Sequence, residues 1–523
     1  MAVAEWVRQQ KRVYFGNASS VRDYRAQLRG ARPALFWAAY LGLLILFVLL
    51  AYANIVSQGE RSVTQIQSEL QSFYNLVMML LEVMVALVAP VIVAMSIQAE
   101  RQRRSMDLIM TAPVSPKYFL VGKILSGYRY VLMLLFLSLP ITAAAVVLGG
   151  ATWSEVLISY CLIASHGLLY IAISLPIAAL SQKVVPTVMY SYVACGMWGY
   201  VSAPIISVMF MFGGMRGGSA GYSEAPFWVL MFPMSTAFNV QTYTEIWGLH
   251  VPNWLLAVAT TLLITKFFVL GAGSALTRIG SKETVSLRIH GLIIALIFSF
   301  VLSIDIFTFG GGLGSIAHDF AIYAAVFTIP LIFVLPHLST WSYIDERKSR
   351  PGAMASVRAC LSGVPEGGLP YLLMVIAAIV GGLWISAALA GASLDTDVLS
   401  YLFWLTGAWV FFWSMGWLLS SFTRTGIGTA RKSHLAFTVL FALLPWPALA
   451  IVQLAMDSAG RVVDVFSIYP LVALKYEVSE IGIVQVMGME FWIVAAVMAY
   501  WGEQRRKKIV SSYGGQTHER QPA

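Results

Sequence analysis

The chain has 523 residues, of which 59% are hydrophobic and 11% are charged, and its formal net charge is +9. Soluble globular proteins contain roughly 45 to 50% apolar and about 25% charged residues, so this composition excludes a soluble enzyme. Of the three cysteines, Cys161 and Cys195 lie in apolar runs and Cys360 lies in a basic loop, which leaves no pair for an extracellular disulfide.

Long apolar runs recur along the chain. A helix needs about 20 apolar residues to cross a hydrocarbon core roughly 30 Å thick. The runs predict an all-α polytopic membrane protein with about twelve transmembrane helices. The predicted spans are 33–56, 73–97, 124–148, 156–180, 184–212, 252–276, 290–309, 317–341, 370–391, 398–421, 434–456 and 481–501.

The basic residues are divided very unequally between the two sides of this topology. The side that holds the N-terminus carries 28 Lys and Arg residues, and the opposite side carries 4. The positive-inside rule therefore predicts that both termini are cytoplasmic. The expected location is the plasma (inner) membrane. Because the basic residues are spread over short loops, anionic membrane lipid explains them and a nucleic-acid partner is not expected.

The first basic stretch has a pattern of its own. In residues 3–15, Val3, Trp6 and Val13 recur near helical spacing among basic residues. This pattern predicts a cytoplasmic amphipathic segment lying on the membrane surface, with a frayed basic tail as the alternative.

The spans repeat as two sets of six. Corresponding spans of the two sets start about 230 to 257 residues apart, which suggests a duplicated unit. We expect a first six-span half at residues 1–283, including the N-terminal segment, and a second at 284–523, ending in a basic cytoplasmic tail.

Two irregular features recur in both halves. A long cytoplasmic segment that opens with Glu-Arg follows the second span of each half, at Glu100 and Glu346. A semi-apolar stretch lies outside the membrane before the sixth span, around Pro233 and Pro470. The second feature predicts short helices that dip into the outer leaflet, with a surface loop as the alternative.

The cytoplasmic segment that starts at Glu100 resembles the signature of permease subunits of the ABC-2 class of ATP-binding-cassette transporters. The resemblance covers about 25 residues and departs from the family where its Gly is replaced by Arg104. The matching positions are Glu100, Arg101, Ser105, Met106, Asp107, Leu108, Ile109, Pro113, Gly122 and Lys123.

This resemblance implies a fused two-half permease that couples to two copies of a separate nucleotide-binding ATPase subunit. ATP and Mg would then bind in the partner, and the coupling residues here would be Glu100, Arg101, Ser105 to Ile109 and Pro113. Met106, Leu108 and Ile109 can form a short helix with an apolar stripe that ends at Pro113, and such a helix suits docking. A solvated loop is the alternative.

No chemistry is expected in this chain itself. Its one Gly-Lys pair, Gly122 and Lys123, is followed by Ile124, so it is not a P-loop. No catalytic, cofactor-binding or metal-binding constellation is predicted, and the chain is not expected to be an enzyme. A packed, hydrogen-bonded His166 is favoured over a metal ligand.

Six charged residues fall inside the predicted spans. Asp305 and Asp319 lie near the outer ends of their spans and are expected to reach the interface, whereas Glu82, Arg129, Lys266 and Glu490 lie deeper. Charges at membrane depth usually pair or face a cavity. Arg129 is expected either to extend to the cytoplasmic interface or to pair with Glu82, and pseudo-symmetry suggests a second pair between Lys266 and Glu490.

The sequence therefore predicts a transport subunit. The expected function is export of a lipidic, drug-like or polysaccharide substrate, driven by ATP. The alternative is a twelve-span secondary transporter driven by protons through Glu82 or Glu490.

Overall fold

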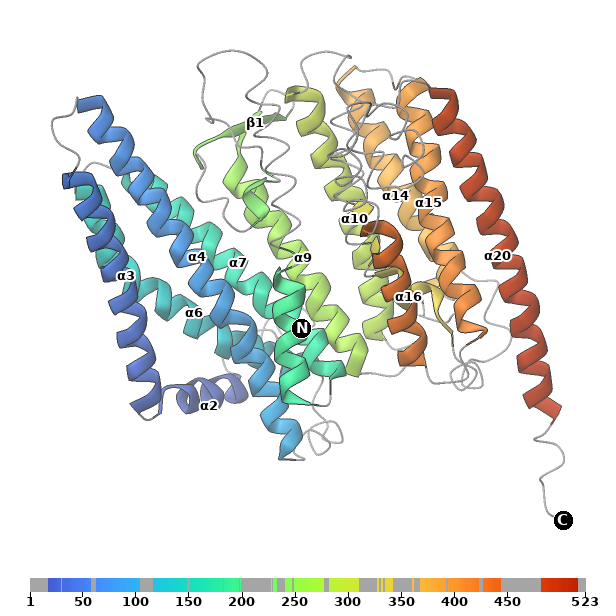
Figure 1. Ribbon diagram of the computed structural model, residues 1–523, viewed down its shortest axis with the longest axis horizontal. Helices are drawn as coiled ribbons and strands as arrows, with labels where there is room; N and C mark the ends of the chain where they lie inside the picture. Colours follow the sequence, from blue (N-terminus) through green and yellow to red (C-terminus); the bar gives the residue numbers. More distant parts are fainter. Residues whose placement is uncertain are drawn as a thin grey trace, which may run out of the picture. The chain divides into compact units, whose positions relative to one another are not determined.

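A computed structural model describes most of the predicted spans (Figure 1). The described residues are 17–29, 31–57, 63–103, 116–147, 151–181, 183–196, 198, 227, 229–232, 240–246, 249–276, 282–309, 327–328, 331–332, 334–341, 360–361, 367–391, 394, 396–422, 427–443 and 481–515. They divide into two compact units, Met1–Arg278 and Ile279–Ala523.

Unit 1 is a bundle of long helices. It contains α2 (Ala18–Gln27), α3 (Ala31–Ser57), α4 (Val63–Gln102), α6 (Pro116–Val147), α7 (Trp153–Leu180) and α9 (Asn253–Leu276). The helix α4 packs against α3, α6 and α7, and α7 also packs against α9. Figure 1 shows α2 lying crosswise at the end of the bundle where α3 begins.

Unit 2 also consists mainly of long helices. It contains α10 (Lys282–Phe309), α14 (Gly368–Leu389), α15 (Thr396–Ser420), α16 (Ile427–Leu443) and α20 (Ile481–Gly515). Helix α10 packs against α14, and α15 packs against α20. A cluster of tryptophans joins α15 to residues 334–341, with the rings of Trp413 and Trp417 stacked 5.3 Å apart and the indole nitrogen of Trp341 donating to the Trp417 carbonyl.

Nine helices in the described part of the chain are long and apolar enough to cross a membrane. Large apolar side chains such as Leu50, Phe136 and Leu157 remain 60%, 71% and 62% exposed on them. Such a surface is stable in lipid and not in water. The chain is therefore an integral membrane protein of the all-α class, as predicted.

The predicted count of twelve spans stays a prediction. The fifth, eighth and eleventh predicted spans, 184–212, 317–341 and 434–456, lie partly outside the described residues, and within the fifth the structure shows the shorter apolar helix Val184–Gly196. Several observed helices are longer than predicted, since α4 has 40 residues and α20 has 35. Helices of that length exceed the roughly 20 residues needed to cross, so their polar ends extend beyond the hydrocarbon core.

The stretch before the sixth span differs from the expectation of a short helix. Its described part forms a single 3-10 turn, η1 (Val229–Met231), and a two-stranded antiparallel hairpin of β1 (Tyr243–Ile246) and β2 (Leu249–Pro252). Asn253, the first residue of α9, holds this hairpin because its side chain donates to the Thr242 hydroxyl and accepts from the Thr244 hydroxyl. The two threonine hydroxyls thus satisfy the buried side-chain amide of Asn253. The corresponding stretch around Pro470, and residues 3–15, lie outside the described residues.

Candidate functional site

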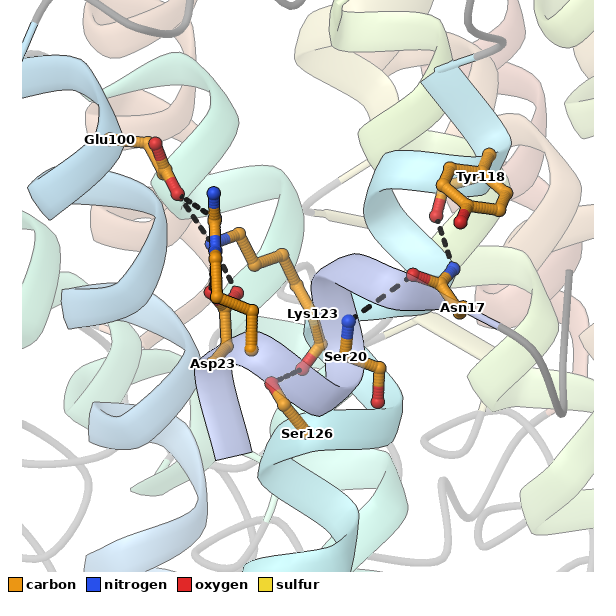
Figure 2. Close-up of polar contacts among 8 residues, drawn as sticks. Asn17, Ser20, Asp23, Glu100, Tyr118, Lys123 and Ser126 are labelled. Carbon is orange, nitrogen blue, oxygen red and sulfur yellow. Dashed lines mark hydrogen bonds and ion pairs between the residues drawn. The ribbon is translucent and has the colours of Figure 1, made fainter. Parts of the chain in front are cut away.

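The candidate site begins with the short helix α2, which packs against α6. Asn17 caps α2, since its side-chain oxygen accepts the backbone N–H of Ser20 at 3.2 Å. Its amide nitrogen donates to the Tyr118 carbonyl at 2.9 Å, and the Tyr118 hydroxyl accepts the Ala18 backbone N–H at 3.2 Å. One residue therefore starts α2 and joins it to the first turn of α6 (Figure 2).

Close approach of the two helices depends on Gly122. A Cβ atom at this position would lie 2.8 Å from the Asn17 side-chain oxygen, closer than real Cβ contacts. Because that oxygen is already held by the α2 cap, it has little freedom to move aside. A glycine is thus required for α2 to lie directly on α6.

Four charged side chains meet where α2, α4 and α6 come together, and we call them the charge cluster: Arg22, Asp23, Glu100 and Lys123. The Nζ atom of Lys123 lies 2.6 Å from Oδ2 of Asp23 and 3.4 Å from Oε1 of Glu100. Arg22 also contacts both carboxylates. Figure 2 shows the Lys123 side chain extending between the two acidic residues.

Three members of the charge cluster are largely removed from water. The Lys123 side chain is 1% exposed, and those of Asp23 and Glu100 are 12% and 10% exposed. A charge removed from water at such a position is costly unless it is paired and hydrogen-bonded. Two positive and two negative charges balance here, so the charge cluster is electrically neutral as a whole.

The same electrostatics act on Arg22, which lies at the outer edge of the charge cluster. Burial alone would lower the pKa of its guanidinium. The hydrogen bond and negative charge of Asp23, together with the charge of Glu100, outweigh that effect and raise the pKa above its ordinary value. The guanidinium therefore stays charged at any physiological pH.

The end of α4 is also joined to the end of α7. The Gln98 amide donates to the carbonyls of Ala178 and Ser181, and Arg101 donates to the Ala179 carbonyl at 2.8 Å. These are the carbonyls that a helix C-terminus leaves without intrahelical partners. Glu100 and Arg101, neighbours in the sequence, thus join α4 to two different helices, α6 and α7.

The predicted coupling residues are only partly described. Glu100 and Arg101 are placed as above, whereas Ser105, Met106, Asp107, Leu108, Ile109 and Pro113 lie outside the described residues, and their docking role stays a prediction. Glu100 lies in the last turn of α4 and Lys123 in the second turn of α6, on either side of residues 104–115. The ion pair between them joins the two helices that flank the predicted coupling segment.

The four charged residues predicted deep inside spans differ in their burial and in their contacts. Glu82 is buried, and its carboxylate contacts the ring of His166. Arg129 is half-buried, with no contact to Glu82 in the described structure. Lys266 and Glu490 are exposed on α9 and α20 of different units, and the proposed pair between them stays a prediction.

Sequence reasoning missed Asp23, Asn17 and Tyr118. One sequence feature could have identified Asp23 as a site residue. It is the sole acidic residue between Glu5 and Glu60, and it lies among the seven basic residues that precede the first span. Asn17 followed by Ala18 and Ser19 is a common N-cap sequence and was a second signal. No group of three or more His, Cys, Asp or Glu side chains suited to a metal ion occurs within the described ranges.

Comparison with known proteins gives one match. Residues 31–202 match a family model described as ABC-2 family transporter protein. The matched residues include Glu100 and Lys123, whereas α2 with Asn17 and Asp23 precedes them. No curated protein and no solved structure matches the chain.

Proposed function

We propose that this chain is the permease subunit of an ATP-binding-cassette exporter, because residues 31–202 match a family model described as ABC-2 family transporter protein. In this proposal two copies of a separate soluble ATPase subunit bind ATP and Mg and drive the transport. The two halves of the chain form the pathway at the plasma membrane, and both termini are cytoplasmic. The substrate class that suits the family is lipidic, drug-like or polysaccharide.

The observation that carries this proposal is the ion pair between Glu100 and Lys123. A cytoplasmic segment can transmit a movement of a docked ATPase only if it is attached firmly to the spans that must move. The charge cluster and the Arg101 contact to Ala179 attach the flanks of residues 104–115 to α2, α4, α6 and α7. An ATPase that pushes on the segment would therefore move several helices together.

Two sets of variants test the proposal. Leu108→Asp with Ile109→Asp would place charges on the apolar stripe of the predicted coupling helix in the first half. Met354→Asp with Val357→Asp is the matched pair in the second half, where Pro351 and Gly352 disfavour a helix. The chain would be purified in mild detergent together with a candidate soluble P-loop ATPase, and assembly and ATP turnover would be measured.

We expect the Leu108 and Ile109 changes to abolish substrate-stimulated ATP turnover and to leave membrane insertion intact, while the second pair has a smaller effect. Normal assembly and stimulation after the Leu108 and Ile109 changes would contradict the coupling role. Equal losses of ATP turnover from both pairs would contradict the prediction that the cytoplasmic segment of the first half couples more strongly than that of the second half. Transport that needs a proton gradient and no ATPase would favour the secondary transporter instead.

A further inference from the structure

The C-terminal end of α20 carries four consecutive basic residues, from Arg505 to Lys508. A helix crosses the hydrocarbon core in about 20 residues. Counted from Val484, where the apolar part of α20 begins, that length ends near Glu503. The ring of Trp501, which is 63% exposed, and the basic residues after it therefore lie at the level of the lipid headgroups.

Gly502 brings this end of α20 directly onto α15. A Cβ atom at Gly502 would lie 2.6 Å from Cδ1 of Trp417. The close approach places the guanidinium of Arg506 over the Trp417 ring, 5.3 Å from its centroid. Both carboxylate oxygens of Glu503 also accept hydrogen bonds from Arg506, at 3.1 and 2.9 Å. Arg506 is therefore a buried and paired charge that fastens α20 to α15, and it is not offered to a ligand.

Arg505 is held at the exposed edge of the same interface. Its guanidinium carbon lies 3.9 Å from the centroid of the Phe422 ring, which follows the end of α15 and is itself 57% exposed. An arginine that lies over an aromatic face keeps its N–H groups in the guanidinium plane, where they point outward. In the part of the chain that the structure describes, no acidic side chain forms an ion pair with Arg505 or Lys508.

Arg505 and Lys508 belong to one stripe of α20. Residues at i, i+4 and i+7 share a helix face, and Trp501, Arg505 and Lys508 have this spacing. On the other side of Trp501 the stripe continues to Val497 and Val494, which are 51% and 44% exposed. The order along it is therefore apolar, aromatic and cationic. We call this surface the α20 stripe, and its members are Val494, Val497, Trp501, Arg505, Lys508 and the adjacent Phe422.

The chemistry of the α20 stripe matches that of a phospholipid with a net negative charge. A phosphate group accepts paired N–H bonds from an arginine and a charge-assisted bond from a lysine. Acyl chains would cover Val494 and Val497, and the amphipathic ring of Trp501 suits the region between the chains and the headgroup. A free phosphate ion would use only the cationic end. A zwitterionic headgroup would add a positive charge beside two cations, so an anionic headgroup fits better.

We propose that the α20 stripe binds one anionic phospholipid, in the leaflet at the C-terminal end of α20, with the lipid phosphate on Arg505 and Lys508. Under the predicted topology this is the cytoplasmic leaflet, in which anionic lipids are concentrated. The bound lipid joins the end of α20 to Phe422. The site uses no residue of the predicted coupling segment and does not depend on what powers transport.

The test measures lipid binding by the full-length chain in a mild non-ionic detergent. The probe is a phosphatidylglycerol that carries pyrene on one acyl chain, and its binding is followed by energy transfer from the tryptophans of the protein. Unlabelled phosphatidylglycerol should displace the probe about tenfold more effectively than phosphatidylcholine with the same acyl chains, because two unbalanced cations face the headgroup. Inorganic phosphate, added at constant ionic strength, should not displace the probe, since it has no apolar part.

Three sets of substitutions locate the site. Arg505→Gln combined with Lys508→Gln should weaken phosphatidylglycerol binding about tenfold and leave phosphatidylcholine binding unchanged. The matched control is Lys507→Gln combined with Lys282→Gln, which removes the same charge from exposed positions outside the α20 stripe and should change the affinity less than about twofold. Phe422→Leu keeps both charges but removes the ring beneath Arg505, and should weaken binding about threefold.

Several results would overturn the proposal. One is equal displacement by phosphatidylglycerol and phosphatidylcholine in the unaltered chain, a measurement that needs no substitution. Equal losses from the two charge pairs would show a general attraction without a site. Displacement of the probe by inorganic phosphate would indicate a site for a soluble anion.

A protein partner is the remaining alternative occupant of the α20 stripe. Loss of ATPase assembly in lipid-free detergent after the Arg505 and Lys508 changes, with unchanged lipid affinity, would assign the stripe to that partner and overturn the proposal. Thermal unfolding in lipid-free detergent would confirm that each variant is folded before its lipid affinity is compared. Failure of the lipid site would leave the coupling proposal untouched, because Leu108 and Ile109 are tested separately.

Discussion

The Nζ atom of Lys123 lies 2.6 Å from Oδ2 of Asp23 across the interface of α6 with α2, and the Lys123 side chain is only 1% exposed. A lysine so deeply buried needs a counter-charge, and the charge comes from a helix that precedes the first span by only a few residues. The position of α2 and the stability of the start of α6 are therefore linked.

This link predicts the effect of neutralising Lys123. Lys123→Met retains most of the side-chain volume but removes the buried positive charge that Asp23 and Glu100 share. We expect a loss of roughly 3 kcal/mol in the stability of the folded chain, the cost of removing one partner of a buried ion pair. Thermal unfolding in detergent would measure it, with Lys117→Met, at an exposed position on the same helix, as the control. Equal stability of the two variants would contradict a stabilising charge cluster.

The contact between Gly122 and Asn17 predicts a coupled pair of substitutions. Asn17→Ala should cost about 1 kcal/mol through loss of the α2 cap. Gly122→Ala should cost roughly 1 to 3 kcal/mol, because the new methyl group would displace the Asn17 side chain from its hydrogen bonds. The loss of stability in the double variant should be smaller than the sum of the two single losses, as expected for residues in contact.

Unfolding of the four members of this cycle would provide the measurement. Gly196→Ala serves as the control, because a Cβ atom at Gly196 meets nothing within 4 Å. Strictly additive losses would show that Asn17 and Gly122 do not act on each other.

In unit 2 a third prediction concerns two glycines of α14. A Cβ atom at Gly368 would lie 1.9 Å from the backbone oxygen of Leu338, whereas at Gly381 it would meet nothing within 4 Å. Gly368→Ala should destabilise the chain by about 3 kcal/mol, because backbone cannot move aside as a side chain can. Gly381→Ala should be neutral or up to about 1 kcal/mol stabilising, since alanine favours a helix. Comparable thermal stability of the two variants would contradict the packing of α14 on residues 334–341.

The predicted topology can be tested at the ends of two described helices. A cysteine replacing Ser154, at the start of α7, should react with an impermeant thiol reagent added outside cells. A cysteine replacing Ser512, in the exposed last turns of α20, should react only after the membrane is permeabilised. The reverse pattern would invert the orientation and move the charge cluster to the outside.

The class of the protein followed from local properties of the sequence. Apolar runs long enough to cross a bilayer need no partner to be recognised, because lipid excludes unpaired backbone groups and leaves the helix as the stable form. The Glu100 signature was equally readable, and residues 31–202, which contain it, match a family model of the class that it suggested. Both signals depend on residues close together in the chain.

Tertiary structure decided which polar residues meet. Glu82 and His166 are separated by 84 positions, and Asp23 and Lys123 by 100. The sequence offered Arg129 as a partner for Glu82, because it is charged and lies on the neighbouring span. The direction in which each side chain points around its helix depends on packing between segments distant in sequence. A buried charge takes the partner that this packing places within hydrogen-bond reach, and helix order along the chain does not specify that partner.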